Sequence, residues 1–158
     1  SDYKMILAPH EVHDSNIQRI RKMFESDEVV VWSEIGEGDL TRARVMLMDT
    51  IGMLSSLYGY GDVAYVGGGF GKGLHNILEA ATYGIPVIFG PNHHKFREAI
   101  DLKERGGAFA VNDFDEFSQT LQALLSDPSK TEKTGKIAKA YVDEHTGATQ
   151  KILSLITL

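Results

Sequence analysis

Glycine dominates the stretch from 63 to 91, where a short apolar run ends at three consecutive glycines. Glycine has no Cβ atom, so its backbone reaches left-handed angles and a ligand can approach it closely. We predict a strand over 63–66, a glycine turn over 67–73 and a helix that opens at His75 and Asn76. The N–H groups and the positive dipole end of such a helix favour an anion, so the expected ligand is a phosphate or a carboxylate.

Two familiar phosphate motifs do not fit this stretch. The pattern Gly-x-Gly-x-x-Gly fails in every register between Gly67 and Asn76, and the Walker pattern fails because Gly73 follows Gly71-Lys72. A dinucleotide-dependent dehydrogenase and a P-loop ATPase are therefore disfavoured. A turn whose glycines only permit close packing is the simpler interpretation, but five glycines with His, Asn and Lys among them favour a ligand.

A carboxylate follows the predicted helix start. Glu79 is three residues beyond Asn76, which places the two side chains on nearly the same face of a helix. A carboxylate beside a bound phosphate can accept hydrogen bonds from paired sugar hydroxyls, which makes a nucleotide sugar a sensible ligand. An acid favoured only by the helix dipole is the equal alternative.

Composition limits the classes of protein. The chain has 158 residues with 42% hydrophobic content, enough for one domain with a sizeable core. A formal net charge of −6 argues against nucleic acid as a partner. Cysteine is absent, which excludes disulfides and thiolate metal sites, and we expect no metal and no cofactor. No apolar run approaches the roughly 20 residues of a membrane span, so we expect a cytoplasmic protein.

Short apolar runs alternate with amphipathic segments, which is typical of an α/β fold with a Rossmann-like parallel sheet and helices on both faces. Strands are expected near 4–8, 29–32, 45–49, 63–66, 86–89 and 108–111. Helices are expected near 13–26, 52–60, 74–83, 95–105, 114–126, 130–144 and 147–157. Asp113 with Glu116 predicts a capped helix start, and Asp127-Pro128 predicts a break between two late helices.

The carboxyl ends of parallel strands are where such sheets hold their ligands. We therefore expect three segments, 9–11, 49–52 and 89–94, to converge on the glycine turn. The last segment contains adjacent histidines, His93 and His94, whose side chains point apart. A solvated loop is expected for this pair.

Four motifs follow one another between residues 47 and 91. They are Leu47-Met48-Asp49-Thr50-Ile51-Gly52-Met53-Leu54, Gly67-Gly68-Gly69-Phe70 with Gly73, His75-Asn76-x-Leu78-Glu79-Ala80-Ala81, and Gly84-x-Pro86-Val87-Ile88-Phe89-Gly90-Pro91. In order and spacing they resemble the C-terminal half of 3-deoxy-D-manno-octulosonic acid (Kdo) transferase. The resemblance implies a GT-B glycosyltransferase of Gram-negative lipopolysaccharide biosynthesis, which moves Kdo from CMP-Kdo to a lipid A precursor by an inverting, metal-independent route.

The resemblance also implies how the work is divided between domains. Residues 1–158 would be most of the CMP-Kdo binding domain, truncated and without the N-terminal acceptor domain. The catalytic base, a glutamate, would lie in that absent half together with the acceptor site and the membrane-associated surface. No catalytic residue is therefore expected in this chain, and the parent enzyme would work at the cytoplasmic face of the inner membrane.

Carried onto this sequence, the resemblance implies a donor site with the CMP phosphate at the glycine turn and the ribose or donor sugar at Glu79. Thr50 to Gly52 would line the nucleotide, and His10 would lie near the base or the donor's acidic groups. Lys72 is included in this donor site only because of its positive charge. The implied donor-binding residues are Gly67, Gly68, Gly69, Lys72, Gly73, His75, Asn76, Glu79, Thr50, Gly52 and His10. Pro9-His10-Glu11 and Met53 depart from the family, where an Arg-His pair and a Glu are common.

Two other functions stay open at the level of sequence. One is another GT-B sugar-nucleotide enzyme, such as a UDP-sugar transferase or an epimerase, and the other is a noncatalytic phosphate-binding module. The final segment, 150–158, carries five large apolar residues in nine. Without a covering surface this segment favours self-association, so a homodimer or an aggregation-prone fragment is expected.

Overall fold

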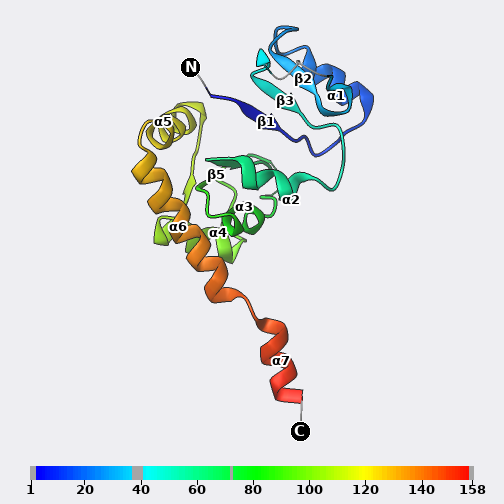
Figure 1. Cartoon of the computed structure of the whole chain (residues 1–158). Coiled ribbons are helices and arrows are strands. Elements are labelled where there is room, and N and C mark those ends of the chain that lie inside the picture. Colours follow the sequence, from blue (N-terminus) through cyan, green and yellow to red (C-terminus); the bar gives the residue numbers. More distant parts are fainter. Residues whose placement is uncertain (1–2, 37–40, 72, 157–158) are drawn as a thin grey trace. The chain divides into compact units, whose positions relative to one another are not determined.

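The structure, a computed structural model, describes residues 3–36, 41–71 and 73–156. The chain divides into two compact units, Ser1–Leu57 and Tyr58–Leu158. Each unit contains its own three-stranded parallel sheet (Figure 1). The strands expected from the sequence are confirmed to within two residues at every end, but they form two sheets where one was expected.

The first unit is built on the sheet β1-β3-β2, with β1 at Met5–Leu7, β2 at Val29–Val31 and β3 at Val45–Leu47. Helix α1, Asp14–Arg21, packs the buried side chains of Ile17 and Ile20 against the valines of β2 and β3. The unit also contains the 3-10 helix η1, Trp32–Glu34, and the short helix α2, Leu54–Leu57.

Helix α1 has recognisable signals at both ends. The ring Nδ1 of His13 accepts the Asn16 N–H at 3.2 Å and so caps the first turn. Arg19 and Arg21 lie in the last turn, where positive charge complements the helix dipole. The helix ends at Arg21, five residues before the expected end, because the chain turns there with the Phe24 N–H bonded to the Arg21 carbonyl.

The second unit is built on the sheet β4-β5-β6, with β4 at Ala64–Val66, β5 at Val87–Phe89 and β6 at Ala108–Ala110. Its helical elements are η3 (Tyr58–Tyr60), α3 (Leu78–Thr82), α4 (Arg97–Arg105), α5 (Phe114–Leu125), α6 (Pro128–His145) and α7 (Ala148–Ile156). The cap predicted at Asp113 is confirmed, since Asp113 accepts the Glu116 N–H at 2.8 Å. The break predicted at Asp127-Pro128 is also confirmed, and there Asp127 accepts the Lys130 N–H at 3.0 Å.

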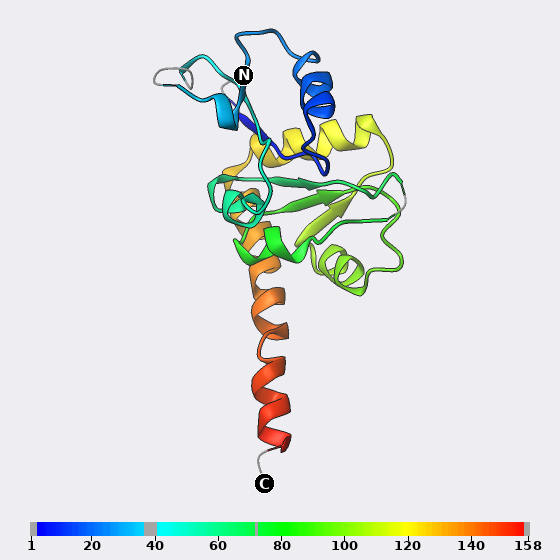
Figure 2. The same ribbon diagram turned by 90° about the vertical axis from the view of Figure 1, so that its right-hand side faces the viewer.

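Helices cover both faces of the β4-β5-β6 sheet (Figure 2). Alternate strand residues face opposite sides, as the period of a strand requires. Val87 and Phe89 enter one hydrophobic cluster with α3, α4 and α6, whereas Ile88 enters a second cluster with α5. The α/β fold with helices on both faces is therefore confirmed in this unit.

One backbone contact fixes α3 against α6. Gly84 ends α3 with a left-handed φ of +71°, and a Cβ atom at Gly135 in α6 would lie 1.9 Å from the Gly84 carbonyl oxygen. Only glycine at 135 allows the two elements to approach so closely. Ala80 and Ala81 of α3 are fully buried in the same cluster. This packing determines where α3, and hence Glu79, lies.

The described part of the chain contains no helix that is both long enough and apolar enough to cross a membrane.

Candidate functional site

A closed loop follows the carboxyl end of β4. In this glycine loop, described at residues 67–71 and 73, the Gly71 N–H donates to the Gly68 carbonyl at 2.9 Å and makes a tight turn. Gly68 has a φ of +90°, a left-handed angle that glycine adopts without strain. The His75 N–H then donates to the Gly67 carbonyl at 3.2 Å, which closes the base of the loop.

Packing accounts for two of the loop glycines. A Cβ atom at Gly68 would lie 2.1 Å from the Gly73 carbonyl oxygen, and one at Gly69 would lie 2.6 Å from the Gly90 nitrogen. Both distances are far below any contact that a real Cβ makes. The simpler interpretation of the sequence, that glycine permits close packing, therefore holds at these two positions.

Packing does not account for Gly67 and Gly71. The nearest atoms to a Cβ would be 4.0 Å away at Gly67 and 3.7 Å away at Gly71, which is ordinary van der Waals contact. Neither glycine has a left-handed φ. Both positions would accept alanine in the free protein, so the packing of the free protein does not require glycine there.

A second loop, residues 90–96 after β5, is bonded to the glycine loop. The Asn92 N–H donates to the Gly69 carbonyl at 2.8 Å, and the Asn92 side-chain amide donates to the Gly71 carbonyl at 3.0 Å. The ring of Phe96 lies 3.4 Å from the position of a Cβ at Gly73. The expected convergence of segment 89–94 on the glycine turn is thus confirmed.

The helix after the glycine loop begins later than the sequence predicts. Helix α3 starts at Leu78, whereas the expected start was residue 74 with His75 and Asn76 in the first turn. The cause is Asn76, whose side-chain oxygen accepts the Leu78 N–H at 3.1 Å and offers the backbone an alternative to helix. His75 and Asn76 therefore precede the helix, and the expectation that they lie in its first turn is wrong.

The Asn76 side chain also orients the predicted carboxylate. Its amide nitrogen donates to Glu79 Oε1 at 3.0 Å. Burial, and then the negative charge of Glu79, raise the pKa of the Tyr58 hydroxyl above its ordinary value. Tyr58 therefore stays protonated at neutral pH and can donate a hydrogen bond. Sequence reasoning missed Tyr58, although it lies inside the predicted helix 52–60.

His93 is a buried residue in a loop that was expected to be solvated. Its side chain is 4% exposed, and its ring packs 5.2 Å from that of Phe89 and 4.6 Å from that of His94. Among the described residues its Nδ1 has no hydrogen-bond partner. Burial, followed by the charge of Lys103 and the neighbouring His94, lowers the pKa of His93, so the buried ring is neutral. His94 itself is exposed, as expected.

Three of the predicted donor-binding residues belong to the first unit and are described there. His10 is exposed after β1, the Thr50 hydroxyl contacts the Met53 sulfur at 3.4 Å, and Gly52 has a φ of +90° in open space. Their convergence on the glycine loop stays a prediction. Lys72 lies outside the described residues.

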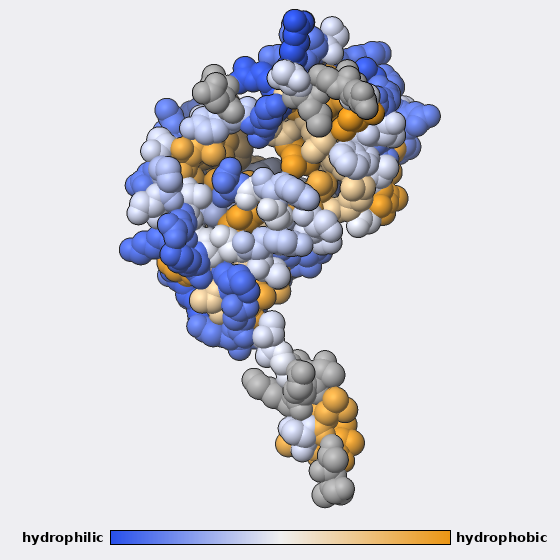
Figure 3. Space-filling model, in the orientation of Figure 1, coloured by the Kyte–Doolittle hydropathy of each residue, from blue (hydrophilic) through white to orange (hydrophobic). Residues whose placement is uncertain are grey.

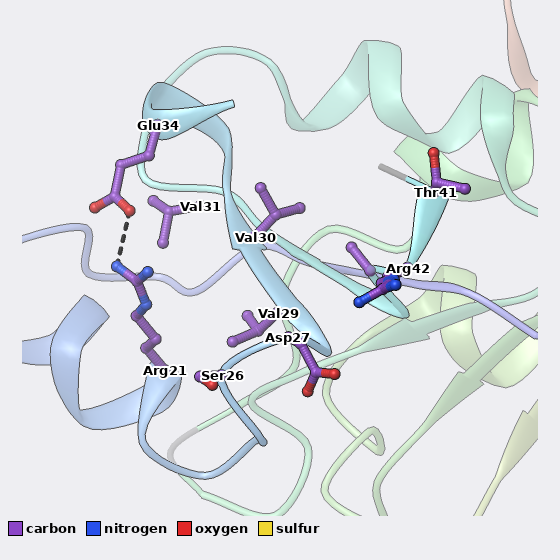
Figure 4. A pocket seen from close by; sticks show the side chains of 10 residues that line it. Arg21, Ser26, Asp27, Val29, Val30, Val31, Glu34, Thr41 and Arg42 are labelled. Carbon is purple, nitrogen blue, oxygen red and sulfur yellow. Dashed lines mark hydrogen bonds and ion pairs between the residues drawn. The ribbon is translucent and has the colours of Figure 1, made fainter. Parts of the chain in front are cut away.

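The first unit contains a hollow of about 390 Å³ beside β2 (Figure 4). The guanidinium of Arg21 lines this hollow and donates to Glu34 Oε2 at 2.7 Å. The hollow is lined by two arginines, Arg21 and Arg42, and by two carboxylates, Asp27 and Glu34, and three buried valines of β2 form part of its wall. Because these charges balance, we place the candidate anion site at the glycine loop instead.

The glycine loop, α3 and the 90–96 loop all lie in a segment that matches a known family. Residues 52–141, more than half of the chain, match the family described as Glycosyl transferases group 1. The chain belongs to this family. It is also 35% identical over 149 residues to a 3-deoxy-D-manno-octulosonic acid transferase of Aquifex aeolicus, covering 91% of this chain and 40% of the relative. The enzyme of the same name from Bordetella pertussis is 34% identical over 114 residues, which cover 71% and 27%. The chain thus spans less than half of these relatives.

Two solved structures are similar in fold. The C-terminal CMP-Kdo binding domain of WaaA from Acinetobacter baumannii superposes with a TM-score of 0.68 at 19% identity, over 92% of this chain and 91% of that one. WaaG, a glycosyltransferase involved in lipopolysaccharide biosynthesis, superposes with a TM-score of 0.52 at 15% identity, over 99% of this chain and 48% of that one. The predicted fold class, the C-terminal half of a GT-B glycosyltransferase, is confirmed.

Replacing Gly68 by alanine should destabilise the protein because the new Cβ adds left-handed strain to the clash with Gly73. We expect the free energy of unfolding to fall by about 3 kcal/mol. Gly106→Ala is the matched control, since Gly106 has a φ of +82° but nothing within 4 Å, and it should cost only about 1 kcal/mol. Urea denaturation measures both, and equal losses would show that the Gly68–Gly73 contact is unimportant.

The burial of His93 predicts a pH dependence of stability. Folding lowers the pKa of His93 below its ordinary value of 6.5. Near and below pH 6.5 the unfolded chain therefore binds more protons at this residue than the folded chain does, so the free energy of unfolding decreases as the pH falls. His93→Gln should reduce the loss of unfolding free energy between pH 7.5 and pH 5.5. His94→Gln should reduce it less, because His94 is only the third of the causes that lower the pKa of His93. Identical pH profiles for the wild type and His93→Gln would contradict the assignment.

Proposed function

We propose that this chain is the donor-binding domain of a Kdo transferase and that it binds CMP-Kdo. The observation that carries the proposal is the match, over 91% of the chain, to a relative named for this activity. The glycine loop, Glu79 and the 90–96 loop all lie inside the segment that matches the family. The similarity in fold to the WaaA domain, a CMP-Kdo binding domain that aligns with 92% of this chain, supports the same donor.

The glycine loop is the proposed phosphate site. The phosphate of CMP lies against the backbone near Gly67 and Gly71, the two glycines whose small size packing does not require. When the bond to Kdo breaks, this phosphate gains negative charge. Backbone dipoles that are already oriented stabilise that charge without rearrangement, because the loop is fixed by its own hydrogen bonds. The five-residue α3 adds little to this stabilisation.

Glu79 is the proposed contact to the ribose or the donor sugar. Its carboxylate is half-buried, held at one oxygen by the Asn76 amide, and can accept hydrogen bonds from vicinal hydroxyls with its remaining capacity. Tyr58, whose hydroxyl stays protonated beside Glu79, is a further donor near the same sugar. His75 lies over the loop, with its Cδ2 atom 3.1 Å from the position of a Cβ at Gly68.

The remaining steps of the reaction belong to the parent enzyme. We assign no catalytic residue to this chain, and we place the catalytic base and the lipid A precursor site in a part of the enzyme outside residues 1–158. His10, Thr50, Gly52 and Lys72 stay in the proposed donor site on the family resemblance. The parent enzyme would act at the cytoplasmic face of the inner membrane, without a metal.

Nucleotide preference tests the proposal. In calorimetry with the full chain, CMP should bind more tightly than UDP or inorganic phosphate. Glu79→Ala should weaken CMP binding about tenfold, the value of one hydrogen bond to a charged group, with an unchanged melting temperature. Glu104→Ala, which removes an exposed acid from α4, is the control and should bind like the wild type.

Each alternative has its own outcome in this experiment. A preference for UDP would indicate another GT-B sugar-nucleotide enzyme. Phosphate binding with no preference among nucleotides would indicate a noncatalytic phosphate-binding module. Unchanged CMP affinity in Glu79→Ala, together with an unchanged melting curve, would remove Glu79 from the site.

We also propose that the chain self-associates through α7. Ile152, Leu153, Leu155 and Ile156 are all more than half exposed, and the surface of α7 is coloured as hydrophobic in Figure 3. Exposed apolar side chains in one short helix favour burial against another surface. Light scattering should give a mass above 17.4 kDa that falls when Leu155 and Ile156 are both changed to Ser. A constant mass of 17.4 kDa across a wide concentration range would contradict this proposal.

A further inference from the structure

Asn92 is the residue that joins the two loops of the candidate site, and neither the sequence motifs nor the family resemblance gives it a role. We propose that Asn92 is a positioning residue that holds the glycine loop in the shape that receives the donor phosphate. The inference rests on the proposed function for the identity of the ligand, and on the geometry of the free protein for the positioning itself.

Asn92 holds the glycine loop at two separate peptides. Its backbone N–H donates to the Gly69 carbonyl at 2.8 Å, and its side-chain amide donates to the Gly71 carbonyl at 3.0 Å. The Gly69 carbonyl lies within the turn that the Gly71 N–H closes onto the Gly68 carbonyl, and the Gly71 carbonyl directly follows this turn. In a trans peptide the C=O and the N–H point in opposite directions. The Gly69 carbonyl points toward Asn92, so the N–H of the same peptide, which belongs to Phe70, points away from the 90–96 loop.

The 90–96 loop is a firm anchor for these bonds. Gly90 contacts the backbone of Gly69, and the buried ring of His93 packs against Phe89 at the end of β5. Two backbone hydrogen bonds fold the loop around Asn92. The His93 N–H donates to the Pro91 carbonyl at 2.9 Å, and the Phe96 N–H donates to the His93 carbonyl at 3.0 Å. Asn92 thus connects a rigid strand end to the more exposed side of the glycine loop.

The side chain and the backbone of Asn92 can be separated by mutation. Any residue except proline keeps the backbone bond to Gly69, but only a side-chain donor of the right length reaches the Gly71 carbonyl. The Asn92 side chain is exposed, so its removal leaves no cavity in the core. The expected effect is therefore on the shape of the glycine loop at Gly71, with little effect on the stability of the fold.

The test compares Asn92→Ala and Asn92→Asp with the control Asn112→Ala in the full chain. Asn112 is also exposed and its amide also donates one hydrogen bond, but to Glu116 at the start of α5. Both Asn92 variants should bind CMP roughly two- to tenfold more weakly than the wild type, as expected for one lost hydrogen bond. Asn92→Asp should weaken CMP binding at least as much as Asn92→Ala, because the new carboxylate would face the Gly71 carbonyl oxygen. The amide NMR signal of Gly71 should shift in both variants, while melting temperatures match that of Asn112→Ala.

The outcomes separate the positioning role from the proposed function. Wild-type CMP affinity in both Asn92 variants, or an equal loss in Asn112→Ala, would overturn the inference. If the wild-type chain does not bind CMP, the proposed function fails. The positioning role of Asn92 is then tested only by the amide NMR signals of the free protein. A shifted Gly71 signal in the Asn92 variants then supports it, and a Gly71 signal identical to that of the wild type overturns it.

Discussion

The site depends on one contact between two backbones. Gly69, after β4, and Gly90, after β5, lie so close that a Cβ atom on either would come within 2.6 Å of the other's backbone. The parallel pairing of Val66 with Phe89 brings the two chain segments side by side at this edge of the sheet. Only because neither residue carries a side chain can the loops touch directly, and the reach of Asn92 across them follows from that contact.

A second glycine contact has a similar effect on the carboxylate. The approach of Gly135 to the turn at Gly84 fixes α3 against α6, and α3 carries Glu79. The orientation of Glu79 is then set locally, by the amide of Asn76. Backbone packing in the core therefore determines where α3 lies, and the local bond from Asn76 determines how Glu79 is oriented on it.

Sequence patterns predicted the parts of the fold that short-range chemistry decides. The valine run of β2, the aspartate cap of α5 and the break before α6 are local signals, and the structure agrees with them. The late start of α3 was not predictable in this way, because it depends on whether the Asn76 side chain or the helix satisfies the Leu78 N–H. The burial of His93 depends on Phe89 and on the fold of the 90–96 loop, so a polar turn sequence led to the wrong expectation.

The two interpretations of the glycine-rich turn are both needed, at different positions. Close packing requires glycine at 68 and 69, where left-handed φ or backbone contact leaves no room for a Cβ. Gly67 and Gly71 have that room, and the proposed phosphate site uses it. In a chain with a net charge of −6, an anionic donor cannot depend on overall attraction. In the proposed site the donor would depend on local dipoles held at fixed angles, and the glycines required by packing are what hold the backbone beside Gly67 and Gly71 in place.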